Sequence, residues 1–359
     1  MGSLMSLVVP SIRTNNKETR LGNIHPEAVV DISQTLFITD AEVQQLADWQ
    51  GAVASLQQAY SQEPQAHSVP PRSMARGEGI WLRSLSAVSP AGAHMGCKLI
   101  SASTAAHRAS YLISLFDRKT MALAALIDGN RITGIRTAAT AVVAVDRAAP
   151  NRALRVAVIG SGFEARGLLS ALAAVRVIDS VKVYSPTASS RQRFADELRR
   201  TLGLRIEPAT SAQEAVGSAD VVLCAARSRD ESPVLQGKWL EPGMTVVSIG
   251  STLPEQREVD EDVIDRAHLI VADMTEEVAH DTGDMLAAAR AGIDFGSRLV
   301  PLWSFVSGQT PRRGAEDIVL YKSVGSALQD IVTAEMLFDR AHARGLGTPL
   351  AHSIVPVSK

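Results

Sequence analysis

The feature that most constrains the fold is a glycine-rich turn between an apolar strand and a helix. Residues 154–159 read Leu-Arg-Val-Ala-Val-Ile, which predicts a buried strand, and Gly-Ser-Gly-Phe-Glu-Ala follows at once before a helical pattern. Gly160 permits a tight turn, Gly162 lets a pyrophosphate approach the backbone, and the small Ala165 lets helix and strand pack closely. The helix N-terminus adds free N–H groups for phosphates. The turn therefore predicts dinucleotide binding, with contacts from Gly160, Ser161, Gly162, Phe163, Glu164 and Ala165.

Strand and helix patterns alternate on both sides of this turn. Strands are predicted at 154–159, 180–184, 219–225, 245–249 and 269–271, with helices at 165–175 and 190–202. Such alternation is typical of a parallel, doubly wound sheet, so we expect an α/β, Rossmann-type nucleotide-binding domain over residues 138–317.

The flanking segments have a different pattern. Short β-branched and apolar segments between residues 68 and 133 predict a mainly antiparallel sheet, and a strand is expected at 36–38. Thr39 lies three residues before Glu42 and predicts a capping box at the start of one helix ending at Tyr60. An Ala-rich helix over 136–148 is expected to link two domains.

After Pro301 the chain leaves the strand–helix alternation, and residues 318–343 predict a strand followed by one long helix. We expect this segment to return to the first domain. The predicted organisation is therefore an extension with little structure of its own at 1–35 and a mixed α+β domain at 36–137 plus 318–359. The nucleotide-binding domain is inserted between the two parts of that mixed domain.

The second strand of the nucleotide unit indicates which dinucleotide is preferred. A carboxylate at its end would bind the ribose 2′-OH of NAD, but the chain after Tyr184 reads Ser-Pro-Thr-Ala-Ser-Ser-Arg. Hydroxyl and guanidinium groups donate to a 2′-phosphate, which a carboxylate would repel. We therefore expect NADP(H) to be preferred, with NAD(H) possible, and with Ser185, Thr187 and Arg191 around the phosphate. The alternative is that Arg191 is a solvated helix residue.

Composition excludes several other classes of function. Lys and Arg number 36 and Asp and Glu number 38, and no basic block is present, so nucleic acid is not an expected partner. The longest apolar runs fall well short of the about 20 residues that span a bilayer, so no membrane association is expected. Cys97 and Cys224 are too few for a disulfide framework, and the histidines show no metal spacing. We expect a cytoplasmic protein without a metal.

Several segments together resemble the ornithine cyclodeaminase/mu-crystallin family. They are Pro71-Arg72, 95–98 (MGCK), 132–139 (ITGIRTAA), the turn at Gly160, 247–260 (VSIGSTLPEQREVD) and 321–330 (YKSVGSALQD). The match runs from Leu36 to the end of the chain. The resemblance implies a substrate and dimerisation domain built from both chain ends, and a homodimer whose sheets join across the subunit interface.

The resemblance also implies which residues meet the substrate. Arg72, Lys98 and Arg136 would converge at the cleft and face the nicotinamide. These residue types suit a planar carboxylate, which Arg binds through two hydrogen bonds and Lys binds as a point charge. The implied partner is a small anionic imino or amino acid, with Lys98 as candidate proton relay. The residues expected beside the nicotinamide are Gly250, Ser251, Ser323 and Gly325.

Thr252 departs from the cyclodeaminase pattern, because ornithine cyclodeaminases carry an aspartate at this position. A threonine hydroxyl is a far weaker base near neutral pH, which disfavours deaminating cyclisation. The expected reaction is NAD(P)H-dependent reduction of a 2-imino acid at its Cα. The imine would be a cyclic ketimine such as Δ1-pyrroline-2-carboxylate or Δ1-piperideine-2-carboxylate, or an acyclic imine of a 2-oxo acid. Thr252 would position water or the imine N–H. The alternatives are a lyase that recycles its NAD and a non-catalytic NADPH-dependent binding protein.

Three charged residues in the resembling segments have other expected roles. Glu258 and Asp284 are expected to tie loops to backbone N–H groups. Lys322 remains open between a residue of the cleft and a surface residue at the start of a helix.

Overall fold

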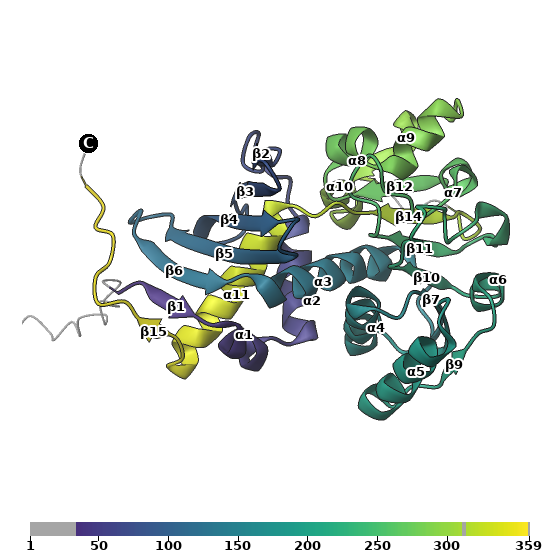
Figure 1. Ribbon diagram of the computed structural model, residues 1–359, viewed down its shortest axis with the longest axis horizontal. Coiled ribbons are helices and arrows are strands. Elements are labelled where there is room, and N and C mark those ends of the chain that lie inside the picture. Colours follow the sequence, from purple (N-terminus) through teal and green to yellow (C-terminus); the bar gives the residue numbers. More distant parts are fainter. Residues whose placement is uncertain (1–33, 311–313, 358–359) are drawn as a thin grey trace, which may run out of the picture. The chain divides into compact units, whose positions relative to one another are not determined.

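A computed structural model describes residues 34–310 and 314–357. The N-terminal extension expected at 1–35 lies outside the described residues except for its last two. The described chain forms two sheets, one of seven strands and one of eight (Figure 1). No helix among these residues is long and apolar enough to cross a membrane.

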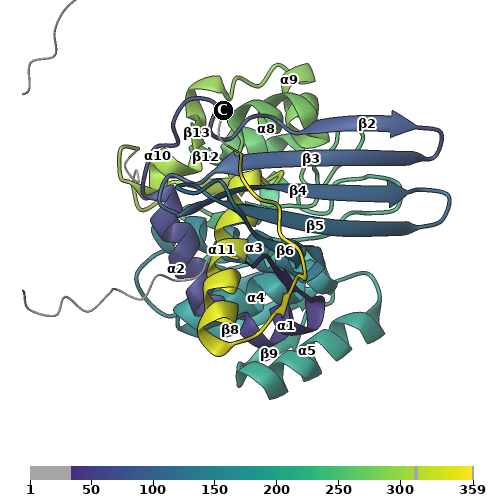
Figure 2. The ribbon, with the colours of Figure 1, turned by 90° about the vertical axis from the view of Figure 1, so that its left-hand side faces the viewer.

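The seven-stranded sheet has the order β15-β1-β6-β5-β4-β3-β2. Its strands are β1 (Leu36–Ile38), β2 (Ser73–Gly77), β3 (Ile80–Val88), β4 (His94–Ser103), β5 (Arg108–Asp117), β6 (Leu123–Asp128) and β15 (Thr348–Pro349). All neighbours pair antiparallel except β1 and β6, which confirms the predicted antiparallel character. Figure 2 shows β2 to β5 lying side by side as long strands. β2 was not predicted, because its sequence lacks an apolar alternation.

The helix expected over 42–60 is two helices, α1 (Asp40–Leu46) and α2 (Trp49–Tyr60). The capping box at Thr39 is confirmed by hydrogen bonds in both directions with Glu42. The prediction of one continuous helix was wrong because Asp48 begins a new one: its carboxylate accepts from the N–H of Gly51 at 2.7 Å.

Two long helices, α11 (Ala327–Arg344) and α3 (Asn130–Ala148), pack against the seven-stranded sheet, and α3 also contacts the eight-stranded sheet. α11 packs on β3, β4 and β5, while α3 packs against α2, α4 and α11 (Figure 1). Ala138, Ala139 and Ala141 of α3 are fully buried. Their small side chains let the neighbouring helices approach closely, so the Ala-rich segment forms the core around which the others pack.

The eight-stranded sheet has the order β13-β12-β14-β11-β10-β7-β8-β9 and is entirely parallel. Its strands are β7 (Leu154–Ile159), β8 (Ile178–Tyr184), β9 (Ile206–Pro208), β10 (Val221–Cys224), β11 (Thr245–Ser248), β12 (Leu269–Ala272), β13 (Leu299–Pro301) and β14 (Val319–Lys322). Its connecting helices are α4 (Phe163–Val175), α5 (Ala188–Leu202), α6 (Ala212–Val216), α7 (Glu261–Arg266), α8 (Thr275–Asp281), α9 (Gly283–Arg290) and α10 (Leu302–Val306), with 3-10 turns at Gly237–Trp239 and Gly296–Arg298.

β14 corrects the expected domain boundary. Residues 318–359 were assigned to the substrate domain, yet β14 pairs with β11 and β12 inside the parallel sheet. The chain therefore crosses from the nucleotide sheet to α11 only after Lys322. The reason is that β14, fully buried on both faces, reads like the other central strands of a parallel sheet.

The position of β7 shows why ligands would bind at the Gly160 turn. Alternate residues of β7 enter two separate cores, Val156 and Val158 on one face and Ala157 and Ile159 on the other. Helices therefore cover both faces, as in a doubly wound sheet. The chain leaves β7 toward β8 on one side, and β10 lies on the other side. The carboxyl end of β7 is thus a topological switch point, where open α/β sheets bind ligands.

Candidate active site

The turn after β7 has the backbone geometry that a dinucleotide requires. Gly160 has φ +116°, and a Cβ atom there would lie 2.5 Å from the carbonyl oxygen of Ala225, the residue that follows the neighbouring strand β10, so only glycine fits. Gly162 precedes α4, and a Cβ there would meet nothing within 4 Å. The N-terminus of α4 is therefore open to a ligand, and these residues fit a bound pyrophosphate.

The segment after β8 brings Ser185, Thr187 and Arg191 together. The hydroxyl of Ser161, in the glycine-rich turn, donates to the Ser185 hydroxyl at 3.0 Å. Nη1 of Arg191 donates to the carbonyl oxygen of Ser185 at 2.8 Å, and its guanidinium lies 5.7 Å from the centre of the Tyr184 ring. The end of β8 therefore carries hydroxyl groups and one cation beside the turn, and no carboxylate follows Tyr184 before α5.

A cavity of about 270 Å³ brings together all the residues predicted to act on the substrate. Arg72, Lys98, Arg136 and Thr252 line it, although they come from a loop, a strand, a helix and another loop. Ser323 and Gly325 line it as well. The sequence had placed these residues at the cleft by resemblance alone, and the cavity shows that the fold does bring them within reach of one small molecule.

Asp330 joins the two cations at the centre of the cavity wall. Lys98 Nζ lies 2.9 Å from Asp330 Oδ1 and donates to the Thr133 hydroxyl at 2.7 Å. Arg136 Nε donates to the same Asp330 oxygen at 3.2 Å, and its Nη1 donates to Gln329 Oε1 at 2.8 Å. Burial lowers the pKa of Lys98, although the attraction of Asp330 opposes this shift. One buried carboxylate therefore orients both cations.

Arg72 has a different partner. The side chain of Arg72 forms an ion pair with Glu277 of α8, and the backbone N–H of Arg72 donates to the same carboxylate at 3.3 Å. Both side chains are largely buried. Arg72 thus lines the cavity while it is held by an acid from the nucleotide-binding part of the chain.

The loop before α11 depends on Gly325. Its φ is +81°, and a Cβ atom would lie 2.5 Å from Arg136 Nη1. Asp273, after β12, fixes this loop: its carboxylate accepts from the Ser323 hydroxyl at 2.6 Å and from the N–H of Gly325 at 2.8 Å. The absence of a side chain at Gly325 therefore makes room for the guanidinium of Arg136.

The loop after β11 places Thr252 in the cavity wall. Gln256 holds it, because Gln256 Oε1 accepts from the N–H of Thr252 at 2.9 Å and from its hydroxyl at 3.1 Å. Gly250 donates its N–H to Glu258 Oε2 at 2.8 Å. Ser251 is fully buried, and its hydroxyl donates to the carbonyl oxygen of Gln256 at 2.6 Å. The side chain of Ser251 therefore stabilises the loop, and its expected contact with the cofactor stays a prediction.

Lys322 lies in a closed polar network behind the strand ends. Its Nζ is 2.9 Å from Asp284 Oδ2 and donates to the Ser248 hydroxyl at 3.0 Å, and neither charged side chain is exposed. Glu258 accepts from the Ser248 hydroxyl at 2.6 Å, and Asp284 accepts from the N–H of Glu258 at 2.9 Å. Burial raises the pKa of Glu258. The expected structural roles of Glu258 and Asp284 are confirmed, whereas the surface alternative for Lys322 was wrong.

Glu164 has an unexpected position. It was predicted as a cofactor contact in the glycine-rich turn, yet its side chain lines the same cavity as Lys98 and Arg136. Its Oε2 is sealed from solvent and has no hydrogen-bond partner among the described residues. Burial raises the pKa of Glu164, against the opposing effect of the two nearby cations. The first turn of α4 thus brings a carboxyl group to the substrate side of the cleft.

The polar cavity residues Arg83, Tyr111 and Asp330 were not predicted as site residues. The pairing of β3 with β4 sets Leu85 opposite Lys98, so Arg83 lies on the same face of the sheet two residues along. Tyr111 lies beneath Lys98, with the ammonium 5.5 Å from the ring centre. Strand alternation would have placed Arg83 on the same face as Lys98, but only if the pairing register of β3 and β4 had been known.

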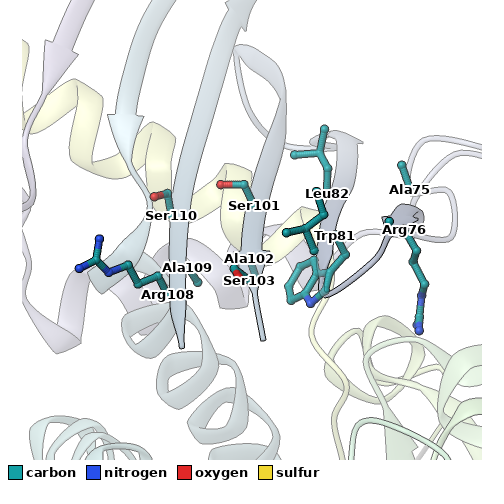
Figure 3. Close-up of a pocket in the computed structure, with 12 residues that line it drawn as sticks. Ala75, Arg76, Trp81, Leu82, Ser101, Ala102, Ser103, Arg108, Ala109 and Ser110 are labelled. Atoms are coloured by element: carbon teal, nitrogen blue, oxygen red, sulfur yellow. The ribbon is translucent and has the colours of Figure 1, made fainter. Parts of the chain in front are cut away.

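A larger pocket of about 660 Å³ lies at the end of the seven-stranded sheet where β2 leads into β3 and β4 leads into β5. Figure 3 shows its lining, which includes Trp81, Leu82 and Ser101 together with the exposed Arg76 and Arg108. It contains no Asp, Glu, His or Cys, so it lacks groups for acid–base chemistry. No cluster of three or more metal-binding side chains occurs in the described part of the chain.

The sequence matches the ornithine cyclodeaminase/mu-crystallin family over residues 33–345. The chain belongs to this family. Among its relatives, a Δ1-pyrroline-2-carboxylate reductase of Bacillus cereus is 31% identical over 238 residues, which are 66% of this chain and 72% of that protein. The ketimine reductase mu-crystallin of Mus musculus is 30% identical over 233 residues, 65% of this chain and 69% of the mouse protein.

Solved structures agree with this membership. The Δ1-pyrroline-2-carboxylate reductase of Thermococcus litoralis, solved with NADH and L-proline, superposes with a TM-score of 0.79 and 26% identity, covering 88% of this chain and 100% of that one. The two proteins share the mixed α/β fold with a parallel nucleotide-binding sheet. The predicted fold class is therefore confirmed.

Proposed function

We propose that this protein is an NAD(P)H-dependent imine reductase that converts a 2-imino acid to the amino acid. One observation carries the proposal: Glu164, on the first turn after the dinucleotide-binding loop, lines the same cavity as Lys98 and Arg136 of the substrate side. A cofactor held by that loop would therefore meet a small anion held by those cations. The relatives named as reductases of Δ1-pyrroline-2-carboxylate and of ketimines support the same reaction.

Substrate binding rests on Lys98 and Arg136. Both are held by Asp330 Oδ1, so their donors converge before any ligand enters. A substrate carboxylate would accept charge-assisted hydrogen bonds from the two groups, and Arg72 would add a third cation on release from Glu277. Fixing the carboxylate also fixes the adjacent Cα, which converts an encounter into an oriented complex. The bound nicotinamide supplies the hydride that this carbon accepts.

Glu164 is the residue that we assign to hold the proton for the imine nitrogen. A protonated imine accepts hydride far more readily than a neutral one, and a buried carboxyl with a raised pKa retains a proton to a higher pH than an ordinary glutamate. Lys98 is the competing candidate, as expected from its chemistry, but its ammonium already donates to Asp330 and Thr133. Glu164→Gln should lower kcat with little change in KM, whereas Lys98→Ala should raise KM most.

Thr252 favours reduction over cyclodeamination. Its hydroxyl donates to Gln256 Oε1 and so presents lone pairs to the cavity, which can accept from an imine N–H or a water. The lyase alternative needs a base at this position, and none of the residues of this loop that line the cavity, Ile249 and Thr252, is an acid. Turnover of L-ornithine to L-proline without net change in cofactor would restore the lyase.

NADP(H) remains the proposed preference. Ser185, Thr187 and Arg191 surround the end of β8, where a 2′-phosphate would lie in a fold of this type. Arg191→Ala should raise the KM for NADPH about tenfold and leave the KM for NADH nearly unchanged, because only the phosphate would contact the guanidinium. An equal effect on both cofactors would contradict this assignment.

We also propose a homodimer that joins through the outer face of the seven-stranded sheet. Ile80, Leu82, Leu99 and Leu112 point to this face and are 36–58% exposed. An apolar sheet face of this kind is normally covered by a partner. Light scattering coupled to gel filtration should give about twice the mass of 38.2 kDa, and Leu82→Lys combined with Leu99→Lys should give the single-chain mass.

The experiment that tests the proposed reaction follows nicotinamide absorbance with NADPH and NADH separately. Substrates are cyclic ketimines, and 2-oxo acids mixed with ammonia or methylamine. Oxidation that depends on one imine class supports the reductase. Tight NADPH binding without oxidation of any imine would favour the non-catalytic alternative. Arg136→Ala, which should abolish turnover but retain NADPH binding, is the matched control.

A further inference from the structure

Arg83 is the one cation of the cavity wall that no protein acid holds. Lys98 and Arg136 share Asp330, and Arg72 is paired with Glu277. The side chain of Arg83 has no hydrogen bond and no ion pair within the described chain, and its Nε is sealed from solvent. A buried donor without an acceptor destabilises the protein, and more so when it is charged. An anion in the cavity that Arg83 lines would give its guanidinium a partner.

The surroundings of Arg83 fix where such an anion would bind. The guanidinium stacks over the Trp81 ring, 5.1 Å from its centre, which holds the side chain in one orientation. Burial, and next to it the charge of Arg72, lower the pKa of Arg83, while the carboxylate of Glu277, which forms its ion pair with Arg72, opposes this shift. Like-charged neighbours destabilise one another unless an anion lies between them, so this part of the cavity is electrostatically suited to a negative group.

The sheet register separates Arg83 from the central anchors. Leu85 pairs with Lys98, and Arg83 is therefore the diagonal neighbour of Lys98 on the same face of the sheet. The backbone positions of diagonal neighbours lie about 7–8 Å apart. Because their side chains leave the sheet at separate positions, the two cations can hold the two ends of one small molecule. The α-carboxylate belongs to Lys98 and Arg136, which Asp330 already orients toward each other.

We propose that Arg83 forms a second anion subsite, so that the preferred substrate is a 2-imino acid whose side chain or N-substituent carries another carboxylate. This proposal rests on the proposed imine reduction and narrows its substrate class. Δ1-pyrroline-2-carboxylate, the substrate named for the Bacillus cereus relative, has a single carboxylate, which would leave Arg83 without a partner. A dicarboxylic imine would satisfy Arg83, and its carbon chain would lie over Leu85 and Ile100 between the two charged ends.

Steady-state kinetics with NADPH test the proposal. Oxaloacetate and 2-oxoglutarate, each with methylamine, supply dicarboxylic imines, and pyruvate with methylamine supplies the monocarboxylic one. The wild-type protein should prefer the dicarboxylic imines by about tenfold or more in kcat/KM. Arg83→Gln should lower that preference by about tenfold to a hundredfold, the value of one or two charge-assisted hydrogen bonds. Arg108→Gln, an exposed arginine of the same sheet outside this cavity, is the matched control and should change neither value.

Two outcomes overturn the subsite. If Arg83→Gln lowers kcat/KM equally for both imine classes, Arg83 binds the α-carboxylate. If the wild type prefers the monocarboxylic imine, no second subsite exists. Failure of every imine to oxidise NADPH would instead overturn the proposed reaction.

A binding measurement separates these cases. With NADP⁺ present, L-aspartate or L-glutamate should raise the thermal unfolding temperature more than L-alanine does, and Arg83→Gln should abolish the difference. Equal shifts for all three amino acids in the wild type would overturn the subsite even in a protein without turnover.

Discussion

Two buried lysines, Lys98 and Lys322, form the same kind of ion pair in two different surroundings. Each ammonium lies 2.9 Å from an aspartate oxygen, Asp330 for the first and Asp284 for the second, and all four side chains are almost or entirely inaccessible. The difference is what surrounds each pair. Lys98 and Asp330 line a cavity, whereas Lys322 and Asp284 are enclosed by Ser248, Ser251 and Glu258.

We call the pair of Lys98 and Asp330, which lines the cavity, the open pair, and the enclosed pair of Lys322 and Asp284 the closed pair. We expect the open pair to take part in ligand binding and the closed pair to stabilise the fold. In the closed pair the donors of Lys322 are used by protein oxygens, including the carbonyl oxygen of Ser251 at 3.2 Å. In the open pair Lys98 donates to Asp330 and Thr133 beside the cavity, and Arg136 shares the Asp330 oxygen that holds Lys98. A ligand can therefore compete for Lys98 without leaving Asp330 alone, because Arg136 would still neutralise it. Burial and ion pairing are common to both lysines, so only the adjoining space distinguishes them.

The largest expected effect is on turnover and follows from removing the open lysine. Lys98→Met should lower kcat/KM for the imine by about a thousandfold, since a carboxylate anchor is lost and Asp330 then repels the substrate. Arg136 continues to compensate Asp330, so the fold should persist. Circular dichroism and NADPH affinity should match the wild type. Retention of a tenth or more of the wild-type kcat/KM would contradict the anchoring role.

The closed lysine should instead determine stability. Lys322→Met leaves the buried Asp284 with Arg257 alone, 3.3 Å from its Oδ1, and removes the cation that also acts on the buried Glu258. This should cost about 3–5 kcal/mol in the free energy of unfolding, and urea denaturation should show the loss. Lys98→Met is the matched comparison and should cost clearly less, because Asp330 keeps Arg136 and lines a cavity that water can enter. If both variants lost the same stability, the distinction between the two pairs would fail.

Local patterns predicted most of the fold. The Gly160 turn indicated the parallel sheet, and the Thr39 capping box marked the start of a helix, since both depend on residues adjacent in sequence. The break at Asp48 and the membership of β14 were not foreseen. The first depends on one cap that competes with a continuing helix, and the second on pairing with strands distant in sequence.

The candidate site was only partly predictable, because its residues are also brought together by contacts between segments distant in sequence. Resemblance indicated Lys98 and Arg136, but neither their shared partner Asp330 nor Arg83 has a local signature. A lone arginine on a strand and a lone aspartate in a helix usually face solvent. Glu164 was predicted only as a cofactor contact and not as a residue of the substrate cavity, because the fingerprint specifies its backbone position and not the direction of its side chain.

Two glycine variants test whether Arg136, which shares Asp330 with Lys98, must keep its position for activity. Gly325→Ala introduces strain at φ +81° and sets a methyl group 2.5 Å from Arg136 Nη1, which must move. We expect kcat/KM to fall by about tenfold to a hundredfold through displacement of Arg136. Gly203→Ala has a similar φ of +68° but nothing within 4 Å, so it should lose only about 1 kcal/mol of stability and no activity. Equal activity losses would indicate a general effect of strain.

The smallest expected effect is a pH dependence confined to the open pair. Burial lowers the pKa of Lys98 from its ordinary 10.5, and only the charged ammonium attracts the substrate carboxylate. The kcat/KM should therefore be highest at pH values below the lowered pKa of Lys98. It should fall by up to tenfold per unit as the pH rises through that pKa, which lies below 10.5. Deprotonation of the imine and of Glu164 also lowers kcat/KM as the pH rises, but these contributions are shared by the variants compared.

Lys98→Arg separates the two contributions, because a guanidinium keeps its charge throughout this range. Its activity should be lower at neutral pH, while its alkaline decline should begin at a higher pH than in the wild type. Lys322→Arg, if it folds, should leave the position of the decline unchanged, because the closed lysine does not contact the cavity. An identical decline in wild type and Lys98→Arg would mean that the imine or Glu164, and not Lys98, causes it. In that case Lys98 would stay protonated across the whole range, and cavity access would not change how a buried lysine titrates.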